Sequence, residues 1–291
     1  MSFNAIPLDN LPAPSAVEEL SYEVLKQQWL DALIVKYPDA EGLLASDPLY
    51  KLVEVGAYRE FLWRNRVNEQ LKQSMLAFAT DSNLDHHAAS FNIERKTLIA
   101  ATEETPAVYE SDEELRTRVQ LSNERRSTAG PRGQYISHTL DSHVDVLDAW
   151  AYKLNPGIVS VIVLSRVGDG AASSELLNAV TTYLNTEERR PMTDDIEVHS
   201  AEIKTYSIHA KVYLMAGPDP VPVLNLIQSN VEKYTKESHR LGFRVALSGI
   251  YSGIHIAGVE RVELEGLDAD IECTDLQAPY CTDITIEPIY A

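Results

Sequence analysis

The chain has 291 residues, of which 44% are hydrophobic and 24% charged, a composition typical of globular proteins. Its 44 acidic residues against 25 lysines and arginines give a formal net charge of −19. Nucleic acids and membrane surfaces are also negatively charged, so this field excludes binding to either through the surface as a whole. The first residues lack the pattern of a signal peptide, and no apolar run approaches the length of a membrane span, so we expect a soluble protein.

The acidic residues are concentrated at the end of the sequence. Residues 259–291 contain nine acidic residues and one arginine, a net charge of −8. The only cysteines, Cys273 and Cys281, have a spacing that matches no zinc site. We therefore expect free thiols, no metal and no cofactor.

Two helices are predicted in the N-terminal third. Ser15 and Glu18 form a capping box that predicts a helix to about Tyr37. Asp47 and Pro48 then predict the start of a second helix. That helix has no proline before about residue 79 and would be about 48 Å long.

An apolar stripe follows the second helix at steps of four, four, four and three residues. Its members are Trp63, Val67, Leu71, Met75 and Phe78. So long a helix cannot bury the whole stripe in a small domain of its own, which indicates bundling with another chain. Packing within its own domain fits the pattern equally well.

The middle of the chain changes from helical to strand patterns. Residues 83–85 predict a turn with a helix cap, and a second capping box, Ser111 to Glu114, predicts a helix through Arg126. After a short helix at 135–142, β-branched runs at 144–152 and 158–163 are separated by Asn155-Pro156-Gly157. This arrangement predicts a β-hairpin.

Two strand-helix-strand cycles complete the sequence. The first has a helix at 173–188 and a strand at 196–198. The second has a strand at 203–215, a breaker at 217–220, helices at 221–237 and 245–256, and a strand at 259–264, before a last strand at 282–287. We predict a multidomain α+β protein with a long-helix arm (1–110), a first α+β domain (111–200) and a second α+β domain (201–291) that ends in a β-containing acidic tail.

No catalytic constellation is evident. Gly168-Asp169-Gly170 precedes a predicted helix, but a dinucleotide fingerprint needs a third glycine and an acidic residue after the next strand. His86 and His87 are adjacent and would point about 100° apart on a helix, so they cannot chelate a metal together. We expect no enzyme activity, and a nucleotide-binding enzyme using the glycine loop stays as the alternative.

Arginines form the one local basic concentration, five within seventeen residues: Arg116, Arg118, Arg125, Arg126 and Arg132. Acidic residues are interspersed and no aromatic residue lies between them for base stacking, which argues against a nucleic-acid site. Arginine pairs carboxylates with two parallel hydrogen bonds. Two interpretations stay open: pairing inside the chain, and docking of an acidic protein surface.

An ordered set of short motifs resembles one known family, the baseplate J proteins of contractile phage tails and phage-derived contractile bacteriocins. The motifs, in the family's order from about Arg59 to the end, are RVNEQ (66–70), LAFA (76–79), NLD (83–85), ESDEELRTR (110–118), TAGP (128–131) with Gly133 and Tyr135, NPG (155–157), RPMTD (190–194), LG (241–242) and GV (258–259). Thr80 and Asp81 depart from this pattern, because the family has a glycine after Ala-Phe-Ala.

The resemblance implies a structural subunit of the baseplate wedge. In this family two copies pair with one smaller tail protein I-like subunit, their helical parts form a wedge core bundle, and their C-terminal domains link wedges into a sixfold ring that widens to trigger sheath contraction. Implied neighbours are a small wedge protein of lysozyme-like fold, the central hub or spike, and the sheath. The implied location is the baseplate of a virion tail or bacteriocin particle, assembled in the host bacterial cytoplasm.

The resemblance gives the unusual charge a use. Asp268, Asp270 and Glu272 belong to the acidic end, and we expect them to face basic patches on neighbouring subunits and to steer assembly. A third hypothesis, an acidic DNA mimic, would require acidic residues along one face, whereas apolar residues dominate the strands.

Overall fold

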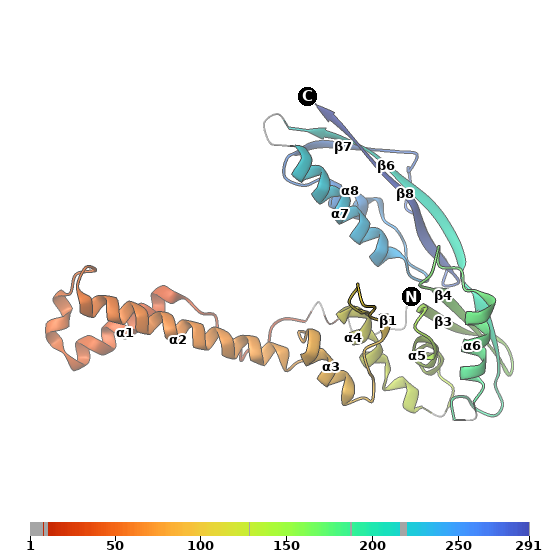
Figure 1. The fold of residues 1–291 in the computed structure, drawn as a ribbon, viewed down its shortest axis with the longest axis horizontal. Helices are drawn as coiled ribbons and strands as arrows, with labels where there is room; N and C mark the ends of the chain where they lie inside the picture. Colours follow the sequence, from red (N-terminus) through yellow and green to blue (C-terminus); the bar gives the residue numbers. More distant parts are fainter. Residues whose placement is uncertain (1–7, 9–10, 128, 187, 216–219, 291) are drawn as a thin grey trace. The chain divides into compact units, whose positions relative to one another are not determined.

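The computed structural model describes residues 8, 11–127, 129–186, 188–215 and 220–290. Helices and sheets are mixed, as the predicted α+β class requires (Figure 1). The described residues form two compact units. We call the one within Ile6–Arg95 and Glu110–Val119 the arm unit, and the one within Lys96–Tyr109 and Gln120–Ala291 the sheet unit.

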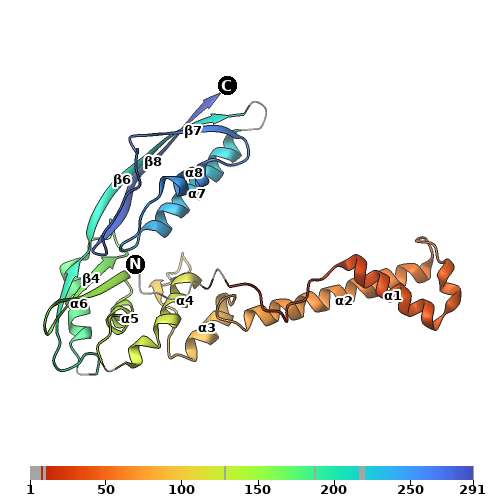
Figure 2. The same cartoon turned by 180° about the vertical axis from the view of Figure 1, so that it is seen from behind.

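Helices build the arm unit: α1 (Tyr22–Lys36), the 3-10 turn η2 (Pro38–Gly42), α2 (Pro48–Gln73), α3 (Asp81–Ala89) and most of α4 (Asp112–Leu121). Figures 1 and 2 show α1 lying along α2. Leu84, Ala88 and Ile93 from the α3 region pack with Leu115 and Val119 of α4 as a separate small core.

Aromatic contacts fix the pairing of α1 with α2. Tyr22 makes edge-to-face contacts with Tyr58 and Phe61, at ring-centroid distances of 6.2 and 6.5 Å. A glycine permits the close approach of the two helices near Trp29, because a Cβ at Gly56 would lie 2.7 Å from the Trp29 ring. Glu18, just before α1, exchanges hydrogen bonds with Asn68 near the end of α2. Trp29, in the middle of α1, lies beside Gly56 in the first half of α2, so the two helices run antiparallel.

Three predictions about helix ends in the arm unit are wrong. The helix predicted from Ser15 begins at Tyr22, and the helix predicted to residue 79 ends at Gln73, so Met75 and Phe78 lie in the turn beyond α2. Residues 83–85 lie inside α3 instead of forming a turn. The capping patterns at Ser15 and at 83–85 do not coincide with the helix starts, and α2 ends at Gln73 although no proline stands there.

A three-stranded sheet and its helices form the first part of the sheet unit, after the small ribbon of β1 (Thr97–Ile99) and β2 (Val108–Tyr109). The elements are η3 (Glu124–Arg126), α5 (Arg132–Ser142), β3 (Val146–Asn155), β4 (Ile158–Ser165), α6 (Ser174–Leu184) and β5 (Asp195–Ser200). The strand order is β3-β4-β5; β3 pairs antiparallel with β4, which confirms the hairpin, and β5 pairs parallel with β4. The helix predicted through Arg126 is wrong: it ends at Leu121 and η3 follows.

The second sheet has the order β7-β6-β8. Its elements are β6 (Glu202–Leu214), α7 (Pro220–Ser238), α8 (Leu247–Ile254), β7 (Val259–Glu265) and β8 (Gln277–Tyr290). The predicted breaker at 217–220 lies outside the described residues except for Pro220, which begins α7. Figures 1 and 2 show α7 and α8 covering one face of this sheet. Alternate β6 residues from Tyr206 to Leu214 are buried, as expected for a sheet covered on one side.

The last strand is longer than predicted. β8 pairs in parallel with β6 from Glu202↔Gln277 to Leu214↔Tyr290. The C-terminal end of the described chain is therefore paired along the whole of β6. The acidic residues 268–275 lie before this strand, in the connection from β7 to β8.

Candidate interaction surfaces

Helix α2 carries apolar side chains on a side that α1 leaves uncovered. Val53 and Ala57 are buried, whereas large apolar residues at other positions of the same helix are exposed. These are Leu52, Val55, Leu62, Trp63 and Val67, which we call the outer face of α2. Their spacing places them on one side of a helix with 3.6 residues per turn. Exposed apolar patches are common at protein interaction sites, so the outer face of α2 is a candidate interaction surface.

The stripe predicted from the sequence does not form a single surface. Trp63 and Val67 belong to the exposed outer face, but Leu71 is half-buried near the end of α2. Met75 and Phe78 are half-buried in the turn that follows. The sequence reasoning missed Leu52, Val55 and Leu62, although their spacing of three and seven residues was a usable signal.

Two of the predicted arginines hold the arm unit together. The Arg116 guanidinium donates to the carbonyl oxygens of Leu76 and Ala79, at 2.9 and 2.8 Å, and so fixes the turn beyond α2. Arg118 forms an ion pair with the buried carboxylate of Glu110. Both arginines therefore have internal contacts, which supports the first of the two interpretations of the cluster.

The other arginines lie in the sheet unit. Arg125 forms an ion pair with Asp141 of α5. Arg126 is exposed at the end of η3. Arg132, the first residue of α5, is exposed and its guanidinium lies 4.4 Å from the centre of the Trp150 ring. The predicted cluster is thus divided between the two units.

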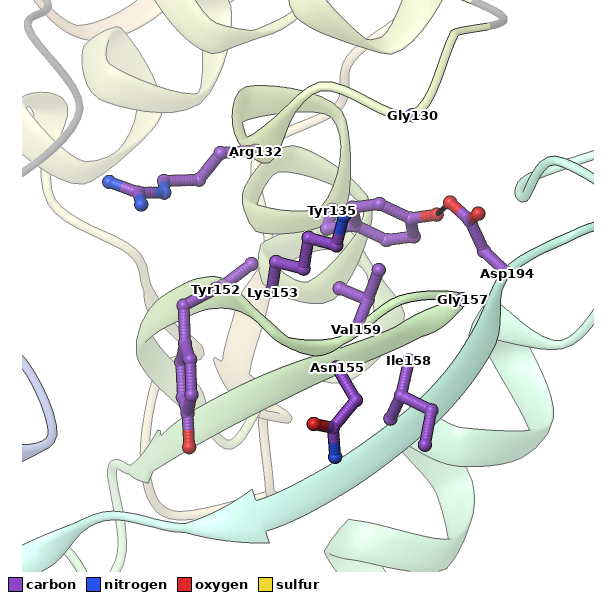
Figure 3. A pocket seen from close by; sticks show the side chains of 11 residues that line it. Gly130, Arg132, Tyr135, Tyr152, Lys153, Asn155, Gly157, Ile158, Val159 and Asp194 are labelled. Atoms are coloured by element: carbon purple, nitrogen blue, oxygen red, sulfur yellow. Dashed lines mark hydrogen bonds between the residues drawn. The ribbon is translucent and has the colours of Figure 1, made fainter.

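A pocket of about 330 Å³ lies at the end of the β3–β4 hairpin, beside the start of α5 (Figure 3). Arg132 and Lys153 bring positive charge to its lining. At its back the Tyr135 hydroxyl donates to the Asp194 carboxylate at 2.6 Å. Burial raises the pKa of Tyr135, and the Asp194 carboxylate raises it further, so this tyrosine stays a neutral donor. Gly130 has a positive φ of 70°, and a Cβ there would lie 2.9 Å from the Asp194 carboxylate.

The acidic connection between β7 and β8 is exposed. Asp268, Asp270 and Glu272 all present carboxylates to solvent. Asp270 accepts the backbone N–H of Leu247, the first residue of α8, at 2.9 Å. Arg244 lies 3.7 Å from Asp270 and 4.0 Å from Glu272, distances that indicate loose pairing at the surface.

The glycine loop at 168–170 has a structural explanation. The N–H of Ser165 donates to the Gly170 carbonyl at 2.8 Å, which closes the loop, and Ser173 caps α6. Gly170 has a φ of 103°, and a Cβ there would lie 2.8 Å from the ring of His239. The loop therefore packs closely against His239, the residue after α7. This packing does not favour a phosphate site.

Asp148 of β3 forms hydrogen bonds that include one to the segment that follows α7. Its carboxylate accepts the N–H of Leu241 at 3.0 Å and that of Ala149 at 2.8 Å. Burial raises the pKa of Asp148, against the opposing effect of these hydrogen bonds. These contacts join β3 to the segment after α7.

The described residues contain neither a metal-binding cluster nor a membrane-spanning helix. No group of three or more His, Cys, Asp or Glu side chains there could hold a metal ion. Among the same residues, no helix is both long and apolar enough to cross a membrane. Cys273 and Cys281 are free thiols, and burial raises the pKa of each.

Comparison with known proteins identifies the class and then the family. Residues 45–102 match the Baseplate J-like N-terminal domain and residues 127–200 match the Baseplate J-like central domain, which places the chain among baseplate structural proteins. It is 40% identical over 292 residues to "Baseplate protein J" of Escherichia phage P2, with 97% of each chain covered. The chain therefore belongs to the baseplate J family, and the resemblance seen in its motifs is confirmed.

A solved structure is also similar, the cryo-EM structure of the anti-feeding prophage baseplate. The match is 12% identical, has a TM-score of 0.42, and covers 61% of this chain and 43% of that chain.

Proposed function

We propose that this protein is a non-enzymatic wedge subunit of a contractile-tail baseplate, in which two copies pair through the outer face of α2. A smaller tail protein I-like subunit completes the helical bundle. The sheet units then link neighbouring wedges into a sixfold ring, which widens to release the sheath. Family membership supports the baseplate role, and the exposed outer face of α2 is the observation that supports pairing.

The burial pattern of α2 supports pairing with another helix. α1 covers one side of the helix, where Val53 and Ala57 are buried. Each large apolar side chain left in water forgoes about 1.5–3 kcal/mol of burial free energy. Leu52, Leu62 and Trp63 are three such residues. Pairing with another helix recovers this free energy without any change in the α1–α2 contact.

An arginine side chain on the outer face fits the same role. Arg66 lies 5.8 Å from the centre of the Trp63 ring. Long charged side chains at the border of an apolar seam cover its edges and select partners.

The double variant Leu62→Asp/Trp63→Asp tests the proposal. Coexpressed with a tail protein I-like subunit, the natural chain is expected to give a complex with two copies, measured by sedimentation velocity. The double variant is expected to stay monomeric with an unchanged circular dichroism spectrum, because both side chains are already exposed.

Met192→Asp is the matched control, since Met192 is a fully solvated apolar residue of the sheet unit. It is expected to assemble like the natural chain. A natural chain that stays monomeric with its partner, or a double variant that assembles normally, would contradict the proposal.

A further inference from the structure

We propose that the pocket between the start of α5 and the β3–β4 hairpin binds the acidic segment Asp268–Asp275 of a second copy of this chain. The proposal rests on the proposed function in one respect, because a ring of wedges brings sheet units of different copies together. The contact has two sides: the basic pocket of one copy and the acidic segment between β7 and β8 of the other.

The pocket side is built from two cations on rigid elements (Figure 3). Arg132 begins α5 and its guanidinium lies over the Trp150 ring, whose side chain is almost fully buried. Stacking of this kind restrains the guanidinium and lowers the entropy lost when it binds a carboxylate. Lys153 projects from β3 into the same lining.

The one carboxylate in the lining is already engaged. Asp194 accepts from the Tyr135 hydroxyl and, at 3.2 Å, from the Thr193 hydroxyl, while Arg190 donates to its backbone carbonyl. Arg132 and Lys153 are therefore the charges that the pocket offers to a ligand, which favours a ligand with carboxylates.

The backbone of β3 favours an extended ligand. Among the described strands β3 pairs with β4 alone, so no described strand occupies its other edge. Residues Ala151 to Lys153 and Asn155 line the pocket along this strand. A peptide segment lying there can add main-chain hydrogen bonds at the edge while its carboxylates meet the cations. A volume of about 330 Å³ fits a short segment rather than a helix.

The segment side carries exposed carboxylates on a backbone that is anchored at the buried Ile271. Asp268 and Glu272 have exposed side chains in the connection from β7 to β8, outside any helix or strand. In its own chain the segment is held in place where Ile271 pairs with Val245 and where Asp270 accepts the N–H of Leu247. The exposed carboxylates of Asp268 and Glu272 remain at even spacing along the backbone, which suits an extended segment beside β3.

A labelled peptide tests the pocket on the full-length protein. The probe is fluorescein-labelled peptide 266–276 with Cys273→Ser, and binding is measured by fluorescence anisotropy. Arg132→Glu/Lys153→Glu is expected to bind at least tenfold more weakly than the natural chain. Lys233→Glu/Lys236→Glu on α7 makes the same charge change at exposed positions and is expected to bind normally.

A charge swap completes the test, because Arg132 also packs on Trp150. A peptide with Asp268→Lys and Glu272→Lys is expected to lose its affinity for the natural chain. The same peptide is expected to bind the Arg132→Glu/Lys153→Glu chain. Binding of the natural peptide is expected to weaken as salt rises from 50 to 300 mM.

Equal affinity of the peptide for the natural chain and the pocket variant, or no binding to either, would overturn the proposal. The peptide contains no part of α2, so Leu62→Asp/Trp63→Asp is expected to bind it like the natural chain. Failure of pairing through α2 and failure of the pocket are thus separate outcomes.

Discussion

His138 is a buried histidine on α5, and neither of its ring nitrogens has a hydrogen-bond partner in the part of the chain that the structure describes. Burial, together with the nearby positive charges of Arg125 and Arg189, lowers its pKa to about 4, against the opposing effect of Asp141. The folded chain therefore resists a proton that the unfolded chain accepts near pH 6.5.

The pH dependence of stability follows from this difference. As the pH falls from about 6.5 towards 4, the unfolded state binds a proton first, so the free energy of unfolding decreases. We expect a loss of about 2 kcal/mol from this group between pH 7.5 and pH 5. His138→Leu should remove that part of the dependence, as measured by urea denaturation at both pH values. An unchanged pH slope in the variant would contradict the assignment.

Gly170 and Gly168 offer a matched pair. Both have a positive φ, of 103° and 71°, but a Cβ at Gly168 meets nothing within 4 Å, whereas one at Gly170 meets His239 and Leu164 at 2.8 Å. Gly168→Ala is expected to cost about 1 kcal/mol for the backbone alone. Gly170→Ala is expected to cost at least twice as much, measured by thermal unfolding, and equal costs would show that the contact with His239 contributes nothing.

At the scale of elements, one of the predicted acidic residues has a structural role. Helix α8 begins after Ala246, which provides no side-chain cap, and Asp270 from the β7–β8 connection accepts the first N–H instead. Asp270→Ala is expected to lower the free energy of unfolding by about 1 kcal/mol, as loss of a cap does. Asp268→Ala is the control and should be neutral, and a neutral Asp270→Ala would exclude the capping role.

Helices and strands were predictable where the hydrophobic periodicity was strong and where turn or cap residues marked their ends. The hairpin of β3 and β4 follows from β-branched runs around Asn155-Pro156-Gly157, and Pro48 correctly marks the start of α2. The end of α2 was not predictable from its own sequence. Arg116 fixes the turn after Gln73 by binding two carbonyl oxygens, and Arg116 comes about forty residues later.

At the scale of the whole molecule, separate cores predict separate unfolding. The arm unit holds the small core around Leu84, and the sheet unit holds cores around Val161 and Ile208. Leu84→Ala is expected to lower one calorimetric transition by the equivalent of about 2–5 kcal/mol and leave the other in place. Val161→Ala should shift the other transition. A single transition that moves with both variants would show that the units unfold together.

The candidate surfaces were only partly predictable. The acidic segment and Arg132 were found because charge is visible in composition, but Lys153 gave no signal, since one lysine in a strand is ordinary. The outer face of α2 was half found: Trp63 and Val67 fit the predicted stripe, and Met75 and Phe78 do not share it.

Length, charge, the α+β class and membership of the baseplate J family were determined by the sequence alone, because each rests on composition, local periodicity or an ordered set of motifs. Only the tertiary structure decided which side of α2 is exposed, which arginines are used internally, and that Arg132 and Lys153 share a pocket. Those outcomes depend on contacts between residues far apart in the chain, which local patterns do not encode.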